Sequence, residues 1–379
     1  MNLELTDMQM KARDTIREFA LREIAPHAKR IDEKSEYPED IIKKLGKLGF
    51  MGVMIPAEHG GAGADTVTYA IAIEEISKRC GSTGALVSVH NSFCPYMIYK
   101  WGNDEQRKRY LPPLARGEVY GAFAGTEPEA GSDLGSMRTT AELKGDHYVI
   151  NGSKTFITGG PKAGTVIVFA STNKAAGAKG LTAFITESAY KGFKVGNILQ
   201  KMGINGSLTS ELIFEDMEVP KENLLGKEGD GFKLALAAID GGRIGIAAQA
   251  VGIAQAALEA SIEYSKKRVQ FGSPIANLQA IQWMLSDMAT RIEAARLLTW
   301  KAATLKDQGA RFSKEAAMAK LFASETAEFC TTKAVQIHGG YGYMKDHPIE
   351  RFYRDARITE IYEGTSEVQR LVISSSLLR

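Results

Sequence analysis

Three short stretches of the sequence combine glycine with carboxylate, hydroxyl, amide and imidazole groups. Such groups on small-residue loops can carry acid–base chemistry and bind a polar cofactor closely. Each stretch alone is also compatible with an ordinary structural turn. Their occurrence together, in this order, is the strongest functional signal in the chain. The stretches are Gly125-Thr126-Glu127-Pro128-Glu129-Ala130-Gly131-Ser132-Asp133, Gln336-Ile337-His338-Gly339-Gly340-Tyr341-Gly342 and Ile361-Tyr362-Glu363-Gly364-Thr365-Ser366-Glu367-Val368-Gln369-Arg370.

Several common catalytic signatures are absent from the sequence. No G-x-G-x-x-G follows a strand and opens a helix, and Gly60-Gly61-Ala62-Gly63 comes after Pro56, which favours a loop. A nicotinamide enzyme on a doubly wound sheet is therefore not expected. H-E-x-x-H, G-x-S-x-G and P-loop motifs are also missing. We find no cysteine cluster for iron–sulfur, no haem motif and no metal-ligand pattern.

Length and composition narrow the class of protein. A chain of 379 residues predicts two or three structural units. Lys plus Arg number 47 against 45 Asp plus Glu, a balance that gives no reason to expect nucleic-acid binding. The sequence shows no apolar run of the roughly 20 residues that a membrane-spanning helix needs. The N-terminus lacks the pattern of a signal peptide. The widely spaced Cys80, Cys94 and Cys330 suggest a reducing compartment.

The N-terminal third reads as helices. Thr6-Asp7-Met8-Gln9 predicts a capping box, and Pro26 predicts the end of the helix that it opens. A helix from Thr66 to Cys80 is expected to end with Gly81 in a left-handed C-cap. Further helices are expected from Pro38 towards Gly46 or Gly49, around Cys94 to Trp101 and around Glu105 to Leu111.

The middle of the chain changes to β-rich runs. Residues 147–150 and 154–157 flank Asn151-Gly152, a pair that predicts a hairpin turn. Further extended runs occur at 166–170, 181–186 and 212–219, and together they predict a compact antiparallel β domain. From Gly229 the pattern is helical again. An apolar stripe formed by Leu278, Ile281, Leu285, Met288, Ile292 and Ala295 predicts a long helix.

The residues between Gly241 and Ala260 are mostly small and would let helices approach closely. A second long helix should carry Phe322 and Phe329 on one face and end at Gly339-Gly340. The resulting division is 1–119 for a helical domain, 120–228 for a β domain and 229–379 for a helical bundle.

The motifs resemble those of the acyl-CoA dehydrogenase family. The resemblance runs from Leu5 to Arg379 and is greatest to the short-chain, butyryl-CoA dehydrogenase branch. It includes Asp240-Gly241-Gly242-Arg243 and Arg268-Val269-Gln270-Phe271-Gly272-Ser273-Pro274-Ile275. It implies an α+β fold with an N-terminal helical domain, a middle antiparallel β domain and a C-terminal four-helix bundle. FAD as cofactor and a homotetramer, built as a dimer of dimers, are also implied.

By this resemblance, Glu363 is the base that removes the α-proton of an acyl-CoA thioester, which becomes the trans-2-enoyl-CoA. A solvated glutamate, with a pKa of about 4.3, is a poor base for so weak an acid. Burial against the flavin and the acyl chain disfavours the carboxylate and raises its pKa. Gly364 beside it leaves room for substrate. In this family the backbone N–H of the base and a flavin ribityl hydroxyl polarise the thioester oxygen, and flavin N5 accepts the β-hydride.

The resemblance places FAD against the middle domain and against a neighbouring subunit. Thr126 should bond the flavin ring, and Phe156 should cover its other face. Many relatives have Trp in place of Phe156 and Asn in place of Gly159. Arg268 should hold the adenosine diphosphate of a neighbour's FAD. The expected cofactor-binding residues are Phe123, Ala124, Gly125, Thr126, Gly131, Ser132, Phe156, Ile157, Thr158, Arg268, Phe271, Gln279, Gln336, Ile337, His338, Gly339, Gly340, Thr365, Ser366 and Glu367.

Six residues should meet the acyl-CoA itself: Ser132, Asp240, Gly241, Gly242, Arg243 and Gly364. Isovaleryl- and long-chain-type relatives carry their base at the position of Gly242, which leaves Glu363 as the family-compatible base here. His90 and His338 receive no acid–base role, because a packed or hydrogen-bonded histidine is more common.

Other functions remain open from the sequence. An acyl-CoA oxidase or flavin monooxygenase of the same superfamily would react with oxygen, although oxidases usually carry an extra C-terminal domain. A dehydrogenase of branched, cyclic or dicarboxylic acyl-CoA would share the motifs, and a non-catalytic acyl-CoA-binding paralogue would lack the intact base. Relatives pass electrons to an electron-transfer flavoprotein. The expected location is cytoplasmic for a prokaryotic chain, or the mitochondrial matrix for a processed eukaryotic one.

Overall fold

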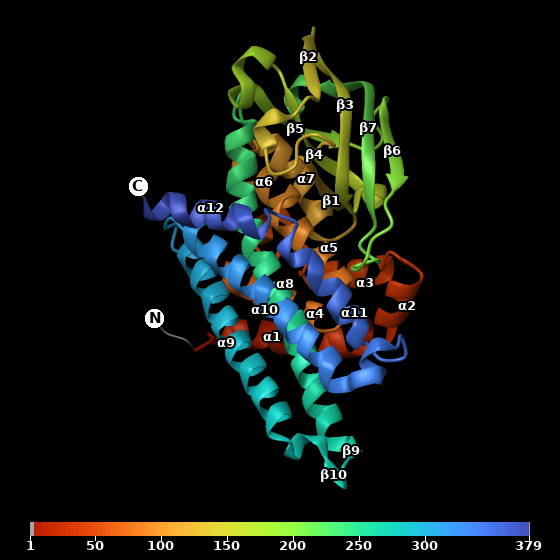
Figure 1. The fold of residues 1–379 in the computed structure, drawn as a ribbon. Coiled ribbons are helices and arrows are strands. Elements are labelled where there is room, and N and C mark those ends of the chain that lie inside the picture. The colour runs from red at the N-terminus through yellow and green to blue at the C-terminus, as the bar shows by residue number, and fades with distance from the viewer. Residues whose placement is uncertain (1–3, 379) are drawn as a thin grey trace.

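The computed structural model describes residues 4–378, and it places a β-sheet at one end of an elongated helical body (Figure 1). Helices precede and follow the sheet in the sequence, as the predicted α+β fold requires. The N-terminal helices are α1 (Asp7–Phe19), α2 (Ala28–Glu33), α3 (Glu39–Lys47), α4 (Thr66–Ser77), α5 (Gly81–Ser92), α6 (Cys94–Trp101) and α7 (Asp104–Ala115).

The predicted capping box opens α1. The Thr6 hydroxyl accepts from the Gln9 N–H at 3.3 Å, and the Gln9 side-chain oxygen accepts from the Thr6 N–H at 2.9 Å. Regular α-helix ends at Phe19. A π-helical turn (Ala20–Ile24) and a 3-10 turn (Ala25–His27) then carry the chain past Pro26 into α2. The predicted break near Pro26 therefore takes the form of two irregular turns.

The predicted role of Gly81 is wrong. Gly81 does not cap α4 but begins α5, and every residue of that helix is buried. A Cβ at Gly81 would lie 2.8 Å from Asp355 Oδ2, so close packing explains the glycine. Helix α5 was not predicted, because its Gly, Ser and Thr residues have modest helix propensity and a fully buried helix shows no amphipathic face.

Eight strands form one sheet in the order β6-β7-β3-β2-β4-β5-β8, and β1 pairs with β4. Most pairs are antiparallel as predicted, but β1 runs parallel to β4, and β2 meets β4 in a short parallel pairing at Thr140 and Ser171. The strands are β1 (Tyr120–Ala124), β2 (Thr140–Lys144), β3 (His147–Thr158), β4 (Ala163–Ser171), β5 (Leu181–Glu187), β6 (Phe193–Ile198), β7 (Thr209–Pro220) and β8 (Leu224–Leu225).

The predicted hairpin turn at Asn151-Gly152 is also wrong. Strand β3 continues through both residues, and its register with β7 shifts between Ile150 and Gly152, as at a β-bulge. The Asn151 side chain binds Asp216 on β7, donating to Oδ1 at 3.0 Å and accepting from the backbone N–H at 2.8 Å. A bulge uses the same Asn-Gly chemistry as a turn, so the dipeptide alone did not separate them.

The C-terminal part contains three long helices, α8 (Gly231–Lys267), α9 (Gln279–Asp307) and α10 (Ser313–His338), followed by α11 (Ile349–Arg357) and α12 (Ser366–Leu377). A short hairpin of β9 (Val269–Gln270) and β10 (Ser273–Pro274) joins α8 to α9 at the end of the molecule far from the sheet (Figure 1). Helix α10 ends before Gly339, as predicted.

Helix α8 runs through the centre of the helical body. Within the described residues it is the one helix long and apolar enough to cross a membrane. The sequence had not predicted any helix of this kind. In this structure 83% of its most apolar stretch is buried inside the protein. Its small residues allow the predicted close approach: a Cβ at Gly252 would lie 2.4 Å from the Glu74 carbonyl oxygen of α4.

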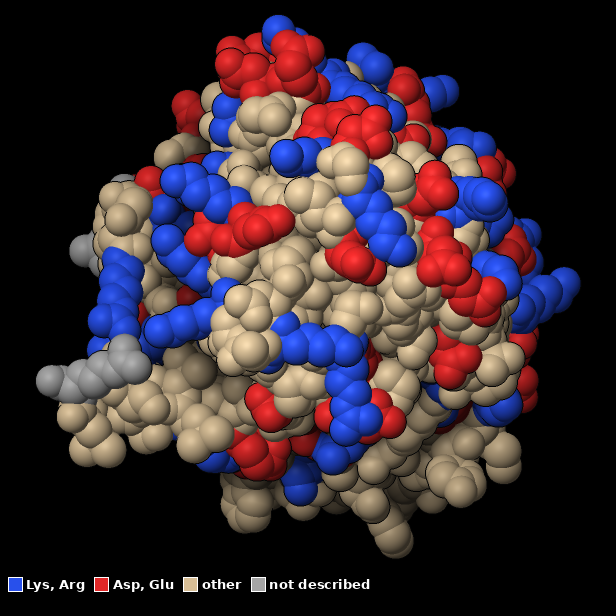
Figure 2. All heavy atoms as spheres, turned by 90° about the horizontal axis from the view of Figure 1, so that it is seen from above, with Lys and Arg blue, Asp and Glu red and all other residues tan. Residues whose placement is uncertain are grey.

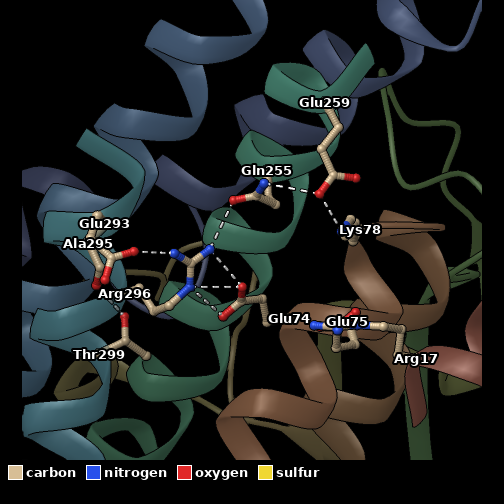
Figure 3. A network of polar contacts seen from close by, with 10 residues as sticks. All are labelled: Arg17, Glu74, Glu75, Lys78, Gln255, Glu259, Glu293, Ala295, Arg296 and Thr299. Atoms are coloured by element: carbon tan, nitrogen blue, oxygen red, sulfur yellow. Dashed lines mark hydrogen bonds and ion pairs between the residues drawn. The ribbon is translucent and has the colours of Figure 1, made fainter. Parts of the chain in front are cut away.

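A polar network fastens the N-terminal helices to the C-terminal bundle (Figure 3). Arg296 on α9 donates to Glu74 on α4 at 2.9 Å and to Gln255 on α8 at 3.0 Å. Burial raises the pKa of Glu74, and Arg296 opposes that rise. Two ion pairs extend the network, Lys78–Glu259 and Arg17–Glu75. A buried charge is tolerated when it is paired, so the network fixes how α4 meets α8 and α9.

Acidic and basic side chains are intermixed on the face that carries the sheet (Figure 2). This distribution agrees with the net charge of +2. The face gives no large field of one sign that would attract a polyanion.

Candidate active site

Glu363 lies in the short loop between α11 and α12, in an unusual backbone conformation. Its φ is +52°, and the φ of the following Gly364 is +93°. A glutamate in the left-handed region followed by a glycine in the same region makes a sharp turn. A positive φ is uncommon for a residue other than glycine, because it is sterically strained. Thr365 then caps α12 by accepting from the Val368 N–H at 3.3 Å. The two ends of the loop are thus fixed by helices, and the turn between them directs the Glu363 side chain inward.

The Glu363 carboxylate faces helix α8 at Gly242. A Cβ on Gly242 would lie 2.2 Å from Glu363 Oε2 and 2.9 Å from the Phe93 ring. Both carboxylate oxygens are buried, and neither has a hydrogen-bond partner within residues 4–378. Burial raises the pKa of Glu363 to about 8, while the nearby cations Lys320 and Arg243 act in the opposite direction. A carboxylate in this environment is a stronger base than a solvated one.

Four of the predicted substrate-binding residues gather at this carboxylate. Gly242 lies beneath it, and Arg243 Nη2 is 3.8 Å from the place where a Cβ on Gly364 would lie. Arg243 is only 4% exposed and donates to Asp240 at 2.6 Å, and its Nε has no partner in the described chain. The other two predicted residues lie elsewhere. Gly241 faces Lys306 on α9, and Ser132 is exposed on a loop of the sheet domain.

Phe93 lies between the base and strand β1, which leads into the first polar stretch at Gly125. Its ring lies close to Gly242 and packs on the Phe123 ring of β1, with centroids 4.5 Å apart. The Thr126 carbonyl accepts from the Thr155 N–H of β3 at 2.9 Å. This bond places residues 123–126 beside Phe156, as the predicted cofactor site requires.

The loop at Thr126 rests on a buried ion pair that sequence reasoning missed. Lys154, which is fully buried, donates to Glu127 at 2.7 Å and to the Gly125 carbonyl at 3.2 Å. Glu127 also accepts from the backbone N–H groups of Arg138 and Thr139 at 2.6 and 3.0 Å. Burial lowers the pKa of Lys154 to about 8.

The residues present fit a flat aromatic group carrying a polar chain. Phe156 is 66% exposed on β3 although its φ is +59°, and such strain commonly marks a functional position. Thr158 is half-buried, but the Ile157 side chain lies in the core, so only its backbone can face a ligand. Exposed Gly131 leaves its backbone open. These features fit FAD, and the individual contacts expected from Phe123 to Thr158 stay predictions.

Gly159, one of the departures from many relatives, has a structural reason. Its φ is +71°, and a Cβ there would lie 2.1 Å from the Tyr120 ring. Any side chain would therefore displace Tyr120, which bonds the Leu86 carbonyl at 3.0 Å.

Around the start of α12, two polar atoms near the base have no partner within the described chain. These are Ser366 Oγ and Gln369 Oε1, both buried. Thr365 uses its hydroxyl as the helix cap, and Glu367 is exposed. Hydrogen bonds from its own backbone N–H and from Thr365 lower the pKa of Glu367. Only Ser366 therefore combines burial with a free hydroxyl.

A second cluster forms a cavity of about 480 Å³ at the far end of the helical body. Arg268, Ile337, His338, Gly339 and Gly340 line it, as the predicted diphosphate site requires. His338 stacks on Tyr264 with centroids 4.3 Å apart and is hydrogen-bonded to the Ala334 carbonyl. Three residues predicted here, Phe271, Gln279 and Gln336, are exposed and lie outside the lining.

The two clusters of one chain are separated along helix α8. Helix α8 begins against the sheet at Leu181 and ends just before Arg268. The base faces α8 at Gly242, and Arg268 lies 26 positions later, which is about 39 Å at about 1.5 Å per residue. One extended dinucleotide does not bridge that length, so the two clusters of one chain do not hold the same cofactor.

The predicted packing of His90 agrees with the structure. His90 is buried, its Nδ1 accepts from the Gly121 N–H at 3.0 Å, and its Nε2 lies 3.1 Å from the Leu114 carbonyl. Burial lowers its pKa to about 4, so the ring is neutral and holds β1 in place. Near the base, sequence reasoning missed Phe93, Lys320 and Gln249, which contacts the Tyr362 hydroxyl.

Comparison with known proteins covers the whole chain. Residues 6–118, 122–217 and 229–378 match the N-terminal, middle and C-terminal domains of acyl-CoA dehydrogenases. The short-chain specific acyl-CoA dehydrogenase of Clostridium acetobutylicum is 52% identical over 379 residues, which is 100% of both chains. An acryloyl-CoA reductase (NADH) of Anaerotignum propionicum is 51% identical over 100% of this chain and 96% of its own.

Solved structures show the same fold. One, from a study of the electron transferring flavoprotein of Acidaminococcus fermentans, has a TM-score of 0.99 at 52% identity and covers 100% of both chains. Butyryl-CoA dehydrogenase from Megasphaera elsdenii also gives 0.99, at 46% identity and 100% of both chains. An acyl-CoA dehydrogenase complexed with FAD from Bacillus anthracis gives 0.94 at 35% identity, over 99% of this chain and 67% of that one. The chain therefore belongs to the acyl-CoA dehydrogenase family.

Proposed function

We propose that the protein catalyses FAD-dependent α,β-dehydrogenation of a short-chain acyl-CoA, with Glu363 as the base and an electron-transfer flavoprotein as the acceptor. The observation that carries this proposal is the buried, unpartnered Glu363 carboxylate facing Gly242 beside two cations. The bound flavin supplies the hydride acceptor. The butyryl-CoA dehydrogenase and the short-chain specific relative support the substrate class.

The chain's own residues orient the substrate and move one proton. Gly242 has no side chain, which lets the Glu363 carboxylate pack against α8 at that point, and Gly364, with a φ of +93°, allows the turn that holds the carboxylate there. Phe93 closes the site on the side of the sheet, which excludes water and keeps Glu363 desolvated. Arg243, held by Asp240, places a positive charge beside the Glu363 carboxylate.

Assay of a series of acyl-CoA thioesters tests the substrate class. With an artificial electron acceptor, butyryl-CoA should give the highest kcat/KM, and an electron-transfer flavoprotein should stimulate turnover. A preference for long, branched, cyclic or dicarboxylic thioesters would contradict the short-chain proposal. Rapid hydrogen peroxide formation without stimulation by an electron-transfer flavoprotein would indicate an oxidase.

Reduction of an enoyl-CoA is a second candidate function. A carboxyl group with a pKa of about 8 is mostly protonated at pH 7, so Glu363 could donate its proton to the α-carbon in the reverse direction. The acryloyl-CoA reductase of Anaerotignum propionicum, at 51% identity, favours this reading. Comparing initial rates of butyryl-CoA oxidation and crotonyl-CoA reduction at one pH separates the two directions.

The position of the second cluster supports assembly into a homotetramer. Because Arg268 lies about 39 Å along α8 from Gly242 at the base of its own chain, it can serve the FAD of another subunit instead. The hairpin beside it exposes Phe271 to 96%, and Tyr343 and Met344 are exposed close to the same cavity. Large exposed apolar side chains in one region are typical of an interface between subunits.

Replacing Arg268 by alanine should therefore lower both FAD occupancy and oligomer stability, since a ligand bound across an interface stabilises the assembled state. The flavin-to-protein absorbance ratio and sedimentation velocity measure the two effects. Lys301→Ala, at an exposed position on α9, is the matched control. A fully flavinated, stable monomer of the Arg268 variant would contradict the shared site.

A further inference from the structure

Lys320 on α10 is a buried lysine beside Glu363 to which the proposed function gives no specific task. Its side chain is 0% exposed, and its helix neighbours Ala316, Ala317 and Ala323 are equally buried. Burying a cation is costly unless polar groups compensate it. Within residues 4–378, no carboxylate oxygen forms an ion pair with its ammonium group. Such a lysine requires an explanation beyond packing.

The ammonium group of Lys320 holds the backbone beside Glu363. It donates to the Gly364 carbonyl at 2.8 Å, and Gln369 donates to the same oxygen at 2.8 Å. Gly364 is the second residue of the left-handed turn that directs the Glu363 side chain towards Gly242. Two donors on the Gly364 carbonyl stabilise the left-handed turn, which is strained and would otherwise relax to another backbone conformation.

The charge of Lys320 also acts on the Glu363 carboxylate. After burial, Lys320 has the largest effect on the pKa of Glu363, and it lowers that pKa. Arg243 acts in the same sense, but Asp240 lies 2.6 Å from it and partly neutralises it. The other charged groups that face Lys320 are Glu360 and Glu367. Of the two cations beside the base, Arg243 forms an ion pair with Asp240, whereas Lys320 forms none within residues 4–378.

We propose that Lys320 is a positioning residue for the base, holding the Glu363-Gly364 turn through the Gly364 carbonyl and stabilising the Glu363 carboxylate by its charge. This inference rests on the proposed role of Glu363 as the base. Removing the ammonium group should release the turn and make Glu363 harder to ionise.

Two substitutions separate the hydrogen bond from the charge. Lys320→Met removes both, whereas Lys320→Gln keeps an N–H donor and removes the charge. For the flavin-loaded enzymes, kcat/KM for butyryl-CoA is measured against pH. In both variants the midpoint of the rise in kcat/KM with pH should move upward by about one pH unit. At pH 7 this shift is about a tenfold loss in kcat/KM. Lys320→Gln should reach a higher plateau at alkaline pH than Lys320→Met. Lys301→Met, at an exposed lysine of α9, should match the unmodified protein.

Infrared titration of the flavin-free proteins gives a second readout that does not depend on turnover. The carboxyl band missing from Glu363→Gln identifies the base, and its midpoint should rise in both Lys320 variants. Unchanged infrared and kinetic midpoints would overturn the inference while leaving the reaction intact. Full turnover of Glu363→Gln would instead remove the proposed base, and with it this role of Lys320. The two failures are therefore distinguishable.

Discussion

Glu363→Gln should yield a folded, flavin-containing protein that has lost most of its dehydrogenation activity. Glutamine has nearly the same shape but cannot accept the α-proton, and loss of a general base typically costs about 10²–10⁴-fold in rate. The measurements are kcat/KM for butyryl-CoA and the flavin absorbance ratio. Glu142→Gln, at an exposed position on β2, is the control. Turnover close to that of the unmodified protein would exclude Glu363 as the base.

The pH dependence of the same reaction follows from the raised pKa of Glu363. The free enzyme carries the carboxylate form only above about pH 8, so kcat/KM should rise about tenfold per pH unit below that value. An opposite slope, falling from pH 6 to 8, would contradict proton removal by this group.

The Glu363→Gln protein should also be the more stable one at neutral pH. In the folded chain burial raises the pKa of Glu363 from 4.5 to about 8, whereas the unfolded chain ionises freely above pH 4.5. The unmodified protein therefore loses stability as pH rises from about 4.5 to 8, by at most about 5 kcal/mol. Denaturant unfolding of the flavin-free proteins across this range measures the difference.

Lys154→Met should destabilise the protein. It leaves the Glu127 carboxylate buried without its cation, and removing one partner of a buried pair costs about 3–5 kcal/mol. The two backbone N–H groups that Glu127 accepts from place the loss towards the lower value. Because the pair holds the loop at Thr126, flavin occupancy should fall as well. Denaturant unfolding at matched subunit concentration and flavin absorbance test both effects.

A double substitution is the sharpest control for that result. Lys154→Met with Glu127→Gln removes the unpaired charge and should recover part of the stability that Lys154→Met loses. Equal losses in the single and double variants would show that packing around the Lys154 stem, and not the ion pair, fixes the loop.

The sequence was informative wherever the signal is local. The capping box at Thr6, the end of α10 at Gly339 and the small residues of α8 each depend on neighbours in the chain, and the structure has all three. Local chemistry misled at Asn151-Gly152, because a bulge and a hairpin turn need the same backbone freedom. Helix α5 gave no periodic pattern, because neighbouring elements bury all of it.

The candidate site divides in the same way. Glu363, Gly242 and Arg243 carry recognisable motifs, and the fold brings them together. Lys154 and Lys320 were not predicted, because a lysine in a strand or on a helix usually faces solvent. Their burial is decided by partners 27 and 44 positions away, Glu127 and Gly364. Such pairings arise only when the chain is folded.

Helix α8 carries Arg243 at the base and leads, 25 positions later, to Arg268 in the distant cavity, without a loop between them. Adding or deleting one residue in this stretch would turn everything beyond it by about 100° and shift it by about 1.5 Å. Either Arg243 or Arg268 would then keep its position in its site, but not both. Insertions and deletions in related sequences should therefore occur in the surface loops of the sheet domain, such as residues 172–180, and be absent from residues 243–267.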